Sequence, residues 1–101
     1  MDELGMGGTN KNAYTGAVHN PYDLDRISGG SSGGCAVLVA SDAAPLAIGT
    51  DTGDSIRKPA AYTGVVGVNQ LMGVFLVMVL FHMHQVWIMS VTLRQISKMQ
   101  L

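Results

Sequence analysis

All but one of the glycines and all of the acidic residues of this chain lie before residue 68, and that break limits what the chain can fold into. Twelve of the thirteen glycines, all three prolines and all seven acidic residues lie in residues 1–67. Residues 68–101 hold one glycine, two charged side chains and five of the seven methionines. We therefore treat residues 1–67 and 68–101 as two parts, because no single sequence pattern describes both.

Short apolar segments alternate with glycine-rich loops in the first part, which predicts an α/β arrangement. Residues 1–30 show neither a helical nor a strand period, so we expect loops there. The elements expected after them are a buried helix over Cys35–Ala40, a buried strand over Leu46–Gly49, a short helix over Arg57–Tyr62 and a strand from Val65. Residues 1–67 are too few to close such a sheet around a sizeable core.

Charge and cysteine content exclude several classes of protein. With six Lys and Arg against seven Asp and Glu, the chain lacks the basic field that gathers nucleic acid or an anionic membrane. If the protein acts on a nucleic acid, we therefore expect a partner to make the contact with it. A single cysteine rules out an intramolecular disulfide and suits a reducing compartment. Since residues 1–4 lack the basic and apolar regions of a secretory signal, we expect a cytoplasmic protein.

Leu71–Leu93 is a run of 23 residues without a charge, which is long enough to span a membrane. However, His82, His84 and Gln85 stand in its middle, where such groups are costly in lipid, and aromatic or basic flanks do not mark both ends. A buried core helix is the alternative. The histidine pair falls short of a metal site, because no Cys, Asp or Glu is near enough to complete the ligand set, so we expect no metal.

Two serines on separate glycine-rich loops, Ser31 and Ser55, are the best candidates for chemistry. Glycine lets the backbone turn sharply and aim consecutive N–H groups at one point, as an oxyanion hole requires. From composition alone, Gly29–Gly34 is also typical of a flexible linker, and the Gly-Lys-Ser/Thr of a phosphate-binding loop does not follow it. Asp51 and Arg57 flank Ser55 and are expected to hold its loop as an ion pair.

Five motifs together account for most of residues 1–67. They are Met1–Gly7 (MDELGMG), Asn20–Arg26 (NPYDLDR), Gly29–Gly34 (GGSSGG), Gly49–Ala60 (GTDTGDSIRKPA) and Gly64–Gly67 (GVVG). This set resembles the amidase signature family, and the first two motifs are most similar to the amidase subunit of tRNA-dependent amidotransferases. The resemblance implies a fragment of the amidase signature fold, a mixed sheet flanked by helices. We assign no fold to the tail, residues 68–101.

An amide hydrolase that works with two serines and a lysine is what the resemblance implies. Ser55 would be the acyl nucleophile, and Ser31, preceded by a cis peptide bond, would bridge it to the lysine. The oxyanion would be bound by the N–H groups of Thr52, Gly53, Asp54 and Ser55, with Gly30, Ser32, Asp51 and Arg57 as supporting residues. The family's lysine lies further upstream than this chain reaches, and Lys11 is in the wrong motif, so no base lysine is assigned.

The resemblance also implies a reaction for the whole enzyme. Ammonia would be released from glutamine, and a partner subunit would use it on a tRNA-bound glutamyl or aspartyl ester with ATP and magnesium. This chain would bind no cofactor itself, would meet tRNA only through that partner, and is expected to be inactive without its lysine. Two alternatives are a fragment of a stand-alone amidase on small amides and, from another class, a noncatalytic membrane or interaction peptide.

Three residues depart from the family or suggest another role. Asp54 stands where many members carry glycine, and its carboxylate would disfavour an oxyanion unless it points away or pairs with Arg57 or Lys58. Cys35 stands where small residues such as serine are common, and we expect it to serve in packing. His19, alone in a polar loop, is expected at the surface and not as a general base.

After Gly67 the sequence departs abruptly from the family, which continues with a run of the type Lys-Pro-Thr-Tyr-Gly. Reading the tail one base out of register restores such a run. Four codon pairs that align with the family's run each allow a single residue, which is the family's residue: Gly from Met72-Gly73, Gly from Met78-Val79, Ala from Met83-His84 and Asp from Trp87-Ile88. The hypothesis is that residues from about Val68 onward are translated in a shifted frame. Their apolar composition would then indicate no specific membrane role.

Overall fold

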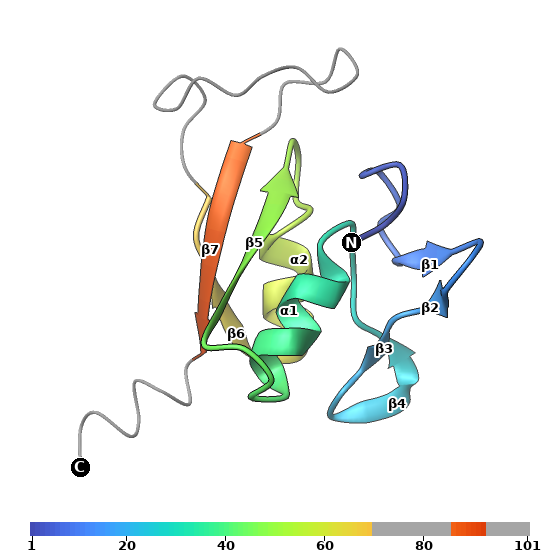
Figure 1. The fold of residues 1–101 in the computed structure, drawn as a ribbon, viewed down its shortest axis with the longest axis horizontal. Coiled ribbons are helices and arrows are strands. Elements are labelled where there is room, and N and C mark those ends of the chain that lie inside the picture. Colours follow the sequence, from blue (N-terminus) through green and yellow to red (C-terminus); the bar gives the residue numbers. More distant parts are fainter. Residues whose placement is uncertain (70–85, 93–101) are drawn as a thin grey trace.

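The computed structural model of the 101-residue chain describes residues 1–69 and the strand at residues 86–92. Two small hairpins precede an α/β layer (Figure 1). The elements in order are β1 (Lys11–Asn12), β2 (Gly16–Ala17), β3 (His19–Asn20), β4 (Asp23–Ile27), α1 (Gly33–Ala40), β5 (Leu46–Asp51), α2 (Arg57–Thr63), β6 (Val65–Gly67) and β7 (Val86–Thr92). The predicted α/β class is confirmed for this part of the chain.

Residues 1–30 contain more strand than predicted. β1 pairs with β2, and β3 pairs with β4, both in antiparallel orientation. The prediction of loops alone was therefore wrong for these residues. The reason is that all five residues of β4 are exposed, so no buried face imposes the alternation by which a strand is recognised.

The sheet of the α/β layer has the order β5-β7-β6, and β7 runs antiparallel to both neighbours. Its pairing with β5 extends from Leu46 opposite Val91 to Asp51 opposite Val86. The strand β7 lies in the tail to which the sequence assigned no fold. Apart from Val68 and Asn69, the rest of that tail lies outside the described residues, including most of the charge-free run and both of its histidines.

Both helices lie on the same face of this sheet, with α1 against β5 and α2 against β6 (Figure 1). Their shared core is small and made of small side chains: Ala36, Val39, Ala40, Ala60 and Val65, with Ala47 packed against them. Close packing is essential here, since a Cβ at Gly67 would lie only 2.7 Å from the Cβ of Ala60. The layer is thus thin, and both helices of the described residues lie on one face of its sheet.

Glycine and proline mark where the elements begin and end. Pro59 is the third residue of α2, in the first turn, where its missing N–H removes no helical hydrogen bond. Gly64 ends α2 in the left-handed conformation, with a φ of 66°, and the chain reverses into β6. The expected helices and strands agree with α1, β5, α2 and β6 within two residues at most ends. Within residues 1–69 and 86–92, no helix is long and apolar enough to cross a membrane.

Candidate active site

The two serine loops meet at one end of the α/β layer. Ser31 and Ser32 directly precede α1, whereas Ser55 follows β5 and precedes α2. The backbone N–H of Ser32 donates a 3.0 Å hydrogen bond to the carbonyl oxygen of Ser55. In Figure 1 the carboxyl end of β5 and the first turn of α1 lie at this same end. The fold therefore brings together the two loops that carry Ser31 and Ser55.

Ser32 joins α1 to β5 through its side chain. Its buried Oγ donates to the carbonyl of Thr50 and accepts from the N–H of Thr50, both at 3.0 Å. Gly49 leaves the space that this contact needs, because a Cβ there would lie 2.7 Å from Ser32 Oγ. The supporting role predicted for Ser32 thus has a clear physical basis in the relative placement of the two loops.

Ser31 is fully buried, and the peptide bond between Gly30 and Ser31 is cis, as the resemblance implied. The carbonyl of Ser31 accepts a 2.7 Å hydrogen bond from the N–H of Asp2. A Cβ at Gly30 would overlap the carbonyl oxygen of Gly7, which explains glycine at that position. Ser31 Oγ has no hydrogen-bond partner within the described part of the chain. Its role as the bridging hydroxyl remains a prediction.

A buried carboxylate shapes the loop before Ser55. Asp51 accepts from the N–H of Gly53 at 2.9 Å and from the N–H of Ile56 at 3.2 Å, and its Oδ2 lies 3.5 Å from Nε of Arg57. Arg57 also donates to the carbonyl of Gly53. The expected ion pair of Asp51 with Arg57 is confirmed. The Gly53 N–H, predicted to bind an oxyanion, is engaged by Asp51 in this structure, so the predicted hole rests on the N–H groups of Thr52, Asp54 and Ser55.

Asp54, the departure from the family's glycine, is paired. Its Oδ2 lies 2.8 Å from Nζ of Lys58, and its side chain remains 55% exposed. The hydrogen bond that Lys58 donates to the Asp54 carboxylate raises the pKa of Lys58 above its ordinary value. Lys58 therefore stays protonated at neutral pH and is unsuited to the role of base. Lys11, on β1, is exposed and belongs to a different motif.

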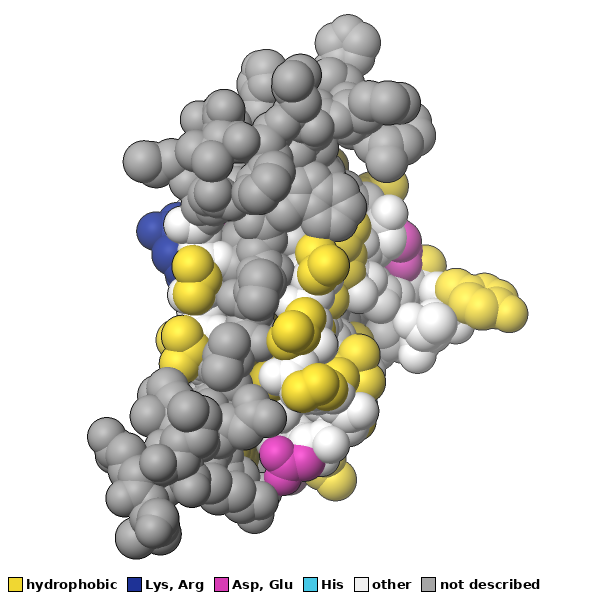
Figure 2. All heavy atoms as spheres, turned by 60° about the vertical axis from the view of Figure 1, so that its left-hand side comes forward, with side chains coloured by type: hydrophobic (Ala, Val, Ile, Leu, Met, Phe, Trp, Pro, Cys, Tyr) yellow, Lys and Arg dark blue, Asp and Glu magenta, His cyan; other side chains and the backbone are white. Residues whose placement is uncertain are grey.

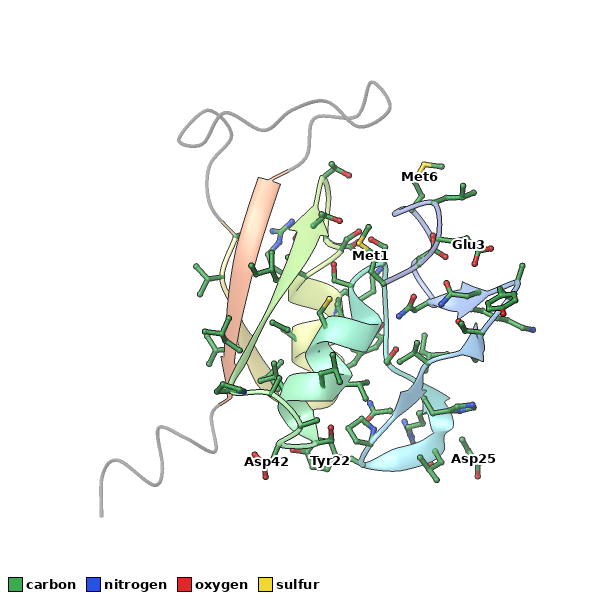
Figure 3. The ribbon with its side chains drawn as sticks, in the orientation of Figure 1. Met1, Glu3, Met6, Tyr22, Asp25 and Asp42 are labelled. Atoms are coloured by element: carbon green, nitrogen blue, oxygen red, sulfur yellow. The ribbon has the colours of Figure 1, made fainter. Side chains whose placement is uncertain are left out.

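Sequence reasoning missed Asp2, which holds the first turn of the chain against the site. One carboxylate oxygen of this buried residue accepts from the N–H groups of Leu4, Met6 and Gly7, at 3.0–3.2 Å. These hydrogen bonds hold the pKa of Asp2 below its ordinary value, and the bond from Gly7 N–H has the largest effect. In Figure 3, Met1 lies on the side of this turn near α1, and Glu3 lies on the other. An Asp just before a glycine-rich segment is typical of such turns and was the available signal.

Asn10 was also missed. It is fully buried and adopts a left-handed φ of 53°. It packs against Gly30 and Gly33, the glycines that flank the Ser31-Ser32 pair. A Cβ at Gly33 would lie 2.6 Å from its Nδ2, and one at Gly30 would lie 3.1 Å from its Cβ. Neither polar atom of its side chain has a hydrogen-bond partner in residues 1–69 or 86–92. Asn tolerates φ > 0 better than most residues, but an isolated Asn is a weak signal in a sequence.

Cys35 and His19 have the environments that were expected. Cys35 is half-buried, its thiol donates to the carbonyl of Ile48 at 3.2 Å, and it lines a small cavity with Ser32, Gly49 and Ile56. His19 is exposed, with Nδ1 2.7 Å from the carbonyl oxygen of Leu24. No group of three or more metal-ligating side chains occurs in the part of the chain that the structure describes.

A family model described as amidase matches residues 1–75. This chain belongs to the amidase family. The A-subunit of the glutamyl-tRNA(Gln) amidotransferase of Legionella pneumophila subsp. pneumophila is 55% identical to the amidase chain over 73 residues, which cover 72% of the chain and 15% of that protein. The protein of the same name from Cupriavidus pinatubonensis is 53% identical over an equal share.

Solved amidases have the same fold. An amidase crystal structure superposes on 94% of this amidase chain with a TM-score of 0.77 and 37% identity, over 23% of its own length. A bacterial aryl acylamidase of the amidase signature family superposes on 65% of the chain, with 50% identity and a TM-score of 0.61. The chain spans about 15% of the length of the curated relatives it matches. It is therefore similar to one piece of the amidase signature fold.

Proposed function

We propose that residues 1–67 form the nucleophile half of a Ser-cisSer-Lys amide hydrolase site, of the kind that releases ammonia from glutamine for a tRNA-dependent amidotransferase. The observation that carries the proposal is the hydrogen bond from Ser32 N–H to the Ser55 carbonyl, which sets the two serine loops side by side. The buried Ser31 hydroxyl, without a partner among the described residues, supports a role in proton transfer. The identity of 53–55% to the amidotransferase proteins favours glutamine as the substrate.

In the proposed reaction, Ser55 Oγ attacks the amide carbonyl carbon while its proton passes through Ser31 Oγ to a neutral lysine. Backbone N–H groups of the loop would stabilise the oxyanion of the tetrahedral intermediate. Collapse of the intermediate breaks the C–N bond, and the nitrogen leaves as ammonia with the proton returned from the lysine. Water, deprotonated by the same relay, then hydrolyses the acyl-serine to glutamate and restores Ser55.

Neither lysine within residues 1–69 and 86–92 suits the role of base in this relay. Lys58 is held protonated by Asp54, and Lys11 lies exposed on the β1 hairpin. We therefore propose that the 101-residue chain alone does not hydrolyse amides. In the complete system the ammonia would pass to a partner subunit, which would use ATP and magnesium on aminoacyl-tRNA, so this chain would contact tRNA only through that partner.

A stand-alone amidase acting on other amides is the second candidate. The aryl acylamidase that superposes on 65% of the chain is 50% identical to it, close to the value for the amidotransferase proteins. An aryl acylamidase and a glutaminase share the nucleophile loop and differ in what holds the rest of the substrate. Activity on anilides with none on glutamine would favour this candidate.

The experiment is to graft residues 1–67 into the Legionella A-subunit in place of its matching segment and to measure ammonia release from glutamine. We expect activity that Ser55→Ala and Ser31→Ala abolish and that Ser41→Ala, at the far end of α1, leaves unchanged. A folded graft without activity would overturn the proposed role of the two serines. The ungrafted chain is assayed beside it, and ammonia release abolished by Ser55→Ala there would overturn its proposed inactivity.

The tail has a separate proposal: residues from about Val68 onward derive from a shifted reading frame. Its support is the agreement of the codon pairs with the family run, and the family match ends at residue 75. The test is to sequence the coding DNA and read it one base over after codon 67. An amidase run is the expected result. A prompt stop codon would contradict the proposal and favour a noncatalytic interaction peptide.

A further inference from the structure

Two of the seven acidic residues are buried, and each lies against one of the two serine loops. Asp51 holds the loop before Ser55, and Asp2 lies against the segment that carries Ser31. The other acidic side chains reach solvent, and Figure 2 shows acidic groups, in magenta, at the surface. A buried carboxylate is costly unless it is hydrogen-bonded, so the burial of Asp2 calls for a specific structural reason.

The main chain of Asp2 contacts Ser31 directly. Its N–H donates to the carbonyl oxygen of Ser31 at 2.7 Å, so the beginning of the chain is bonded to the residue that the proposed relay uses. In Figure 3, Met1, the residue before Asp2, lies on the side of the turn near α1, which Ser31 precedes. This hydrogen bond fixes the carbonyl side of Ser31.

The carboxylate of Asp2 acts on the same segment through Gly7. Its Oδ2 accepts from Gly7 N–H at 3.0 Å, and a Cβ at Gly7 would lie 2.7 Å from the Cγ of Asp2. The carbonyl oxygen of Gly7 accepts from Asn10 N–H at 3.1 Å and lies against Gly30, where a Cβ would overlap it. The carboxylate therefore sets the place of Gly7, and Gly7 sets the place of the residue before Ser31.

The direction of the Ser31 hydroxyl depends on this main-chain placement. Ser31 Oγ is buried and has no hydrogen-bond partner within residues 1–69 and 86–92. Ser32 differs, because Thr50 holds its Oγ with two hydrogen bonds. Among the described residues, the place of Ser31 Oγ therefore follows from the backbone, which Asp2 holds through its N–H and through its side chain.

We propose that Asp2 is the positioning residue of Ser31: its N–H and its carboxylate together hold the Gly30–Ser31 main chain and keep the hydroxyl where the proton relay needs it. The inference rests on the proposed function, in which Ser31 passes on the proton of Ser55. Asp2 acts by placement, because its carboxylate is buried and bonded to the N–H groups of its own turn. A misplacement of about 1 Å is enough to slow a reaction about 100-fold.

NMR on the isotope-labelled full chain tests the placement. The three-bond couplings between Hα and Hβ of Ser31 report its χ1 rotamer and hence the direction of its hydroxyl. We expect one staggered rotamer in the wild type and averaged couplings in Asp2→Ala, whereas Asp2→Asn keeps an acceptor oxygen and should restore the single rotamer. Glu3→Ala is the matched control, because Glu3 is a carboxylate of the same turn that accepts from Ala13 N–H instead.

Ser32 is the internal reference, since Thr50 holds its hydroxyl independently of Asp2. Averaged Ser31 couplings in the wild type or in Glu3→Ala, a single Ser31 rotamer in Asp2→Ala, or equal averaging at Ser31 and Ser32 would each overturn the positioning role. If Asp2→Ala does not fold, Gly7→Ala interrupts the same route from the other side, because its Cβ would overlap the carboxylate. A single Ser31 rotamer in Gly7→Ala would then overturn it.

The catalytic consequence is measured in the graft that tests the proposed function. We expect Asp2→Ala to lower kcat for glutamine at least about tenfold per folded enzyme, with KM within about twofold of the wild type. Glu3→Ala should change neither. An active graft in which Asp2→Ala keeps its kcat would overturn the positioning role. A folded wild-type graft without activity would overturn the proposed function, and the Ser31 couplings would still decide whether Asp2 places the hydroxyl.

Discussion

Asp51 Oδ1 lies 2.9 Å from the backbone nitrogen of Gly53 and accepts its hydrogen, so one buried carboxylate holds the turn that leads to Ser55. The other oxygen of Asp51 accepts from Ile56 N–H and pairs with Arg57. Three neighbouring groups thus depend on a single side chain. This arrangement explains why an acidic residue can stand buried at the end of β5, where an unpaired charge would be costly.

Replacing Asp51 tests this dependence. Asp51→Ala leaves two N–H groups and the pairing of Arg57 uncompensated, so we expect the free energy of unfolding to fall by roughly 2–4 kcal/mol. Urea unfolding followed by circular dichroism measures the change. Asp25→Ala on the exposed strand β4 is the control and should change stability by less than about 0.5 kcal/mol. Equal losses in the two variants would show that Asp51 does not organise the loop.

Two glycines near the site should differ in how strongly substitution by alanine destabilises the chain. A Cβ at Gly49 would lie 2.7 Å from Ser32 Oγ and 3.0 Å from Ile56 Cδ1, whereas a Cβ at Gly53 meets no heavy atom within 4 Å. We expect Gly49→Ala to destabilise the chain by about 1–3 kcal/mol through overpacking. Gly53→Ala should stay within about 1 kcal/mol of the wild type. Thermal and urea unfolding of the two variants measure these changes in stability. A Gly49→Ala variant as stable as the wild type would refute the close packing around Gly49.

The stability of the chain should depend on the charge of Asp2 in acid. Because the N–H groups of Gly7, Met6 and Leu4 lower the pKa of Asp2 in the folded state, its contribution is present above the ordinary value of 3.8 and is lost as pH falls through the lowered one. Asp2→Asn should therefore reduce stability at pH 7 and flatten its decline toward pH 3. Part of the decline will persist, since Arg26 lowers the pKa of Asp23 as well. Glu3→Gln is the control, and an identical profile in Asp2→Asn would contradict the assignment.

Removing the carboxylate of Asp54 should alter the titration of Lys58. The hydrogen bond that Lys58 donates to Asp54 is the main cause of the raised pKa of Lys58, so in Asp54→Gly that pKa should fall back toward its ordinary value of 10.5. NMR titration of the Lys58 side chain measures it, with the exposed Lys11 as the internal reference. A pKa of Lys58 that does not move in Asp54→Gly would mean that the pair is not formed in solution.

The helices and strands after residue 30 could be predicted because glycine and proline mark their ends. Gly33, Pro59 and Gly64 stand at or near helix boundaries, and short apolar segments fill the space between them. The hairpins before residue 30 could not be predicted, because their strands are exposed and lack a period. β7 was beyond prediction for another reason. Its segment does not continue the family pattern that identifies the first part.

The candidate site was predicted at the level of its loops and not of its supports. Ser31 and Ser55 could be identified because each lies in a glycine-rich motif of the sequence. The structure brings their loops into contact. Asp2 and Asn10 support the same loops from a distant part of the sequence, so their importance depends on packing that no local pattern reveals. The sequence allowed either Arg57 or Lys58 as the ion-pair partner of Asp54. The structure selects Lys58 because Asp51 already engages Arg57.

The double hydrogen bond between Ser32 Oγ and the main chain of Thr50 fixes the two serine loops to each other without help from the segment that connects them in sequence. That segment, from the end of α1 to the start of β5, turns at the opposite end of the layer (Figure 1). Insertions between Ser41 and Pro45 would therefore lengthen the polypeptide without moving either serine. The chain offers a permissive location there for a tag, a reporter or an added loop.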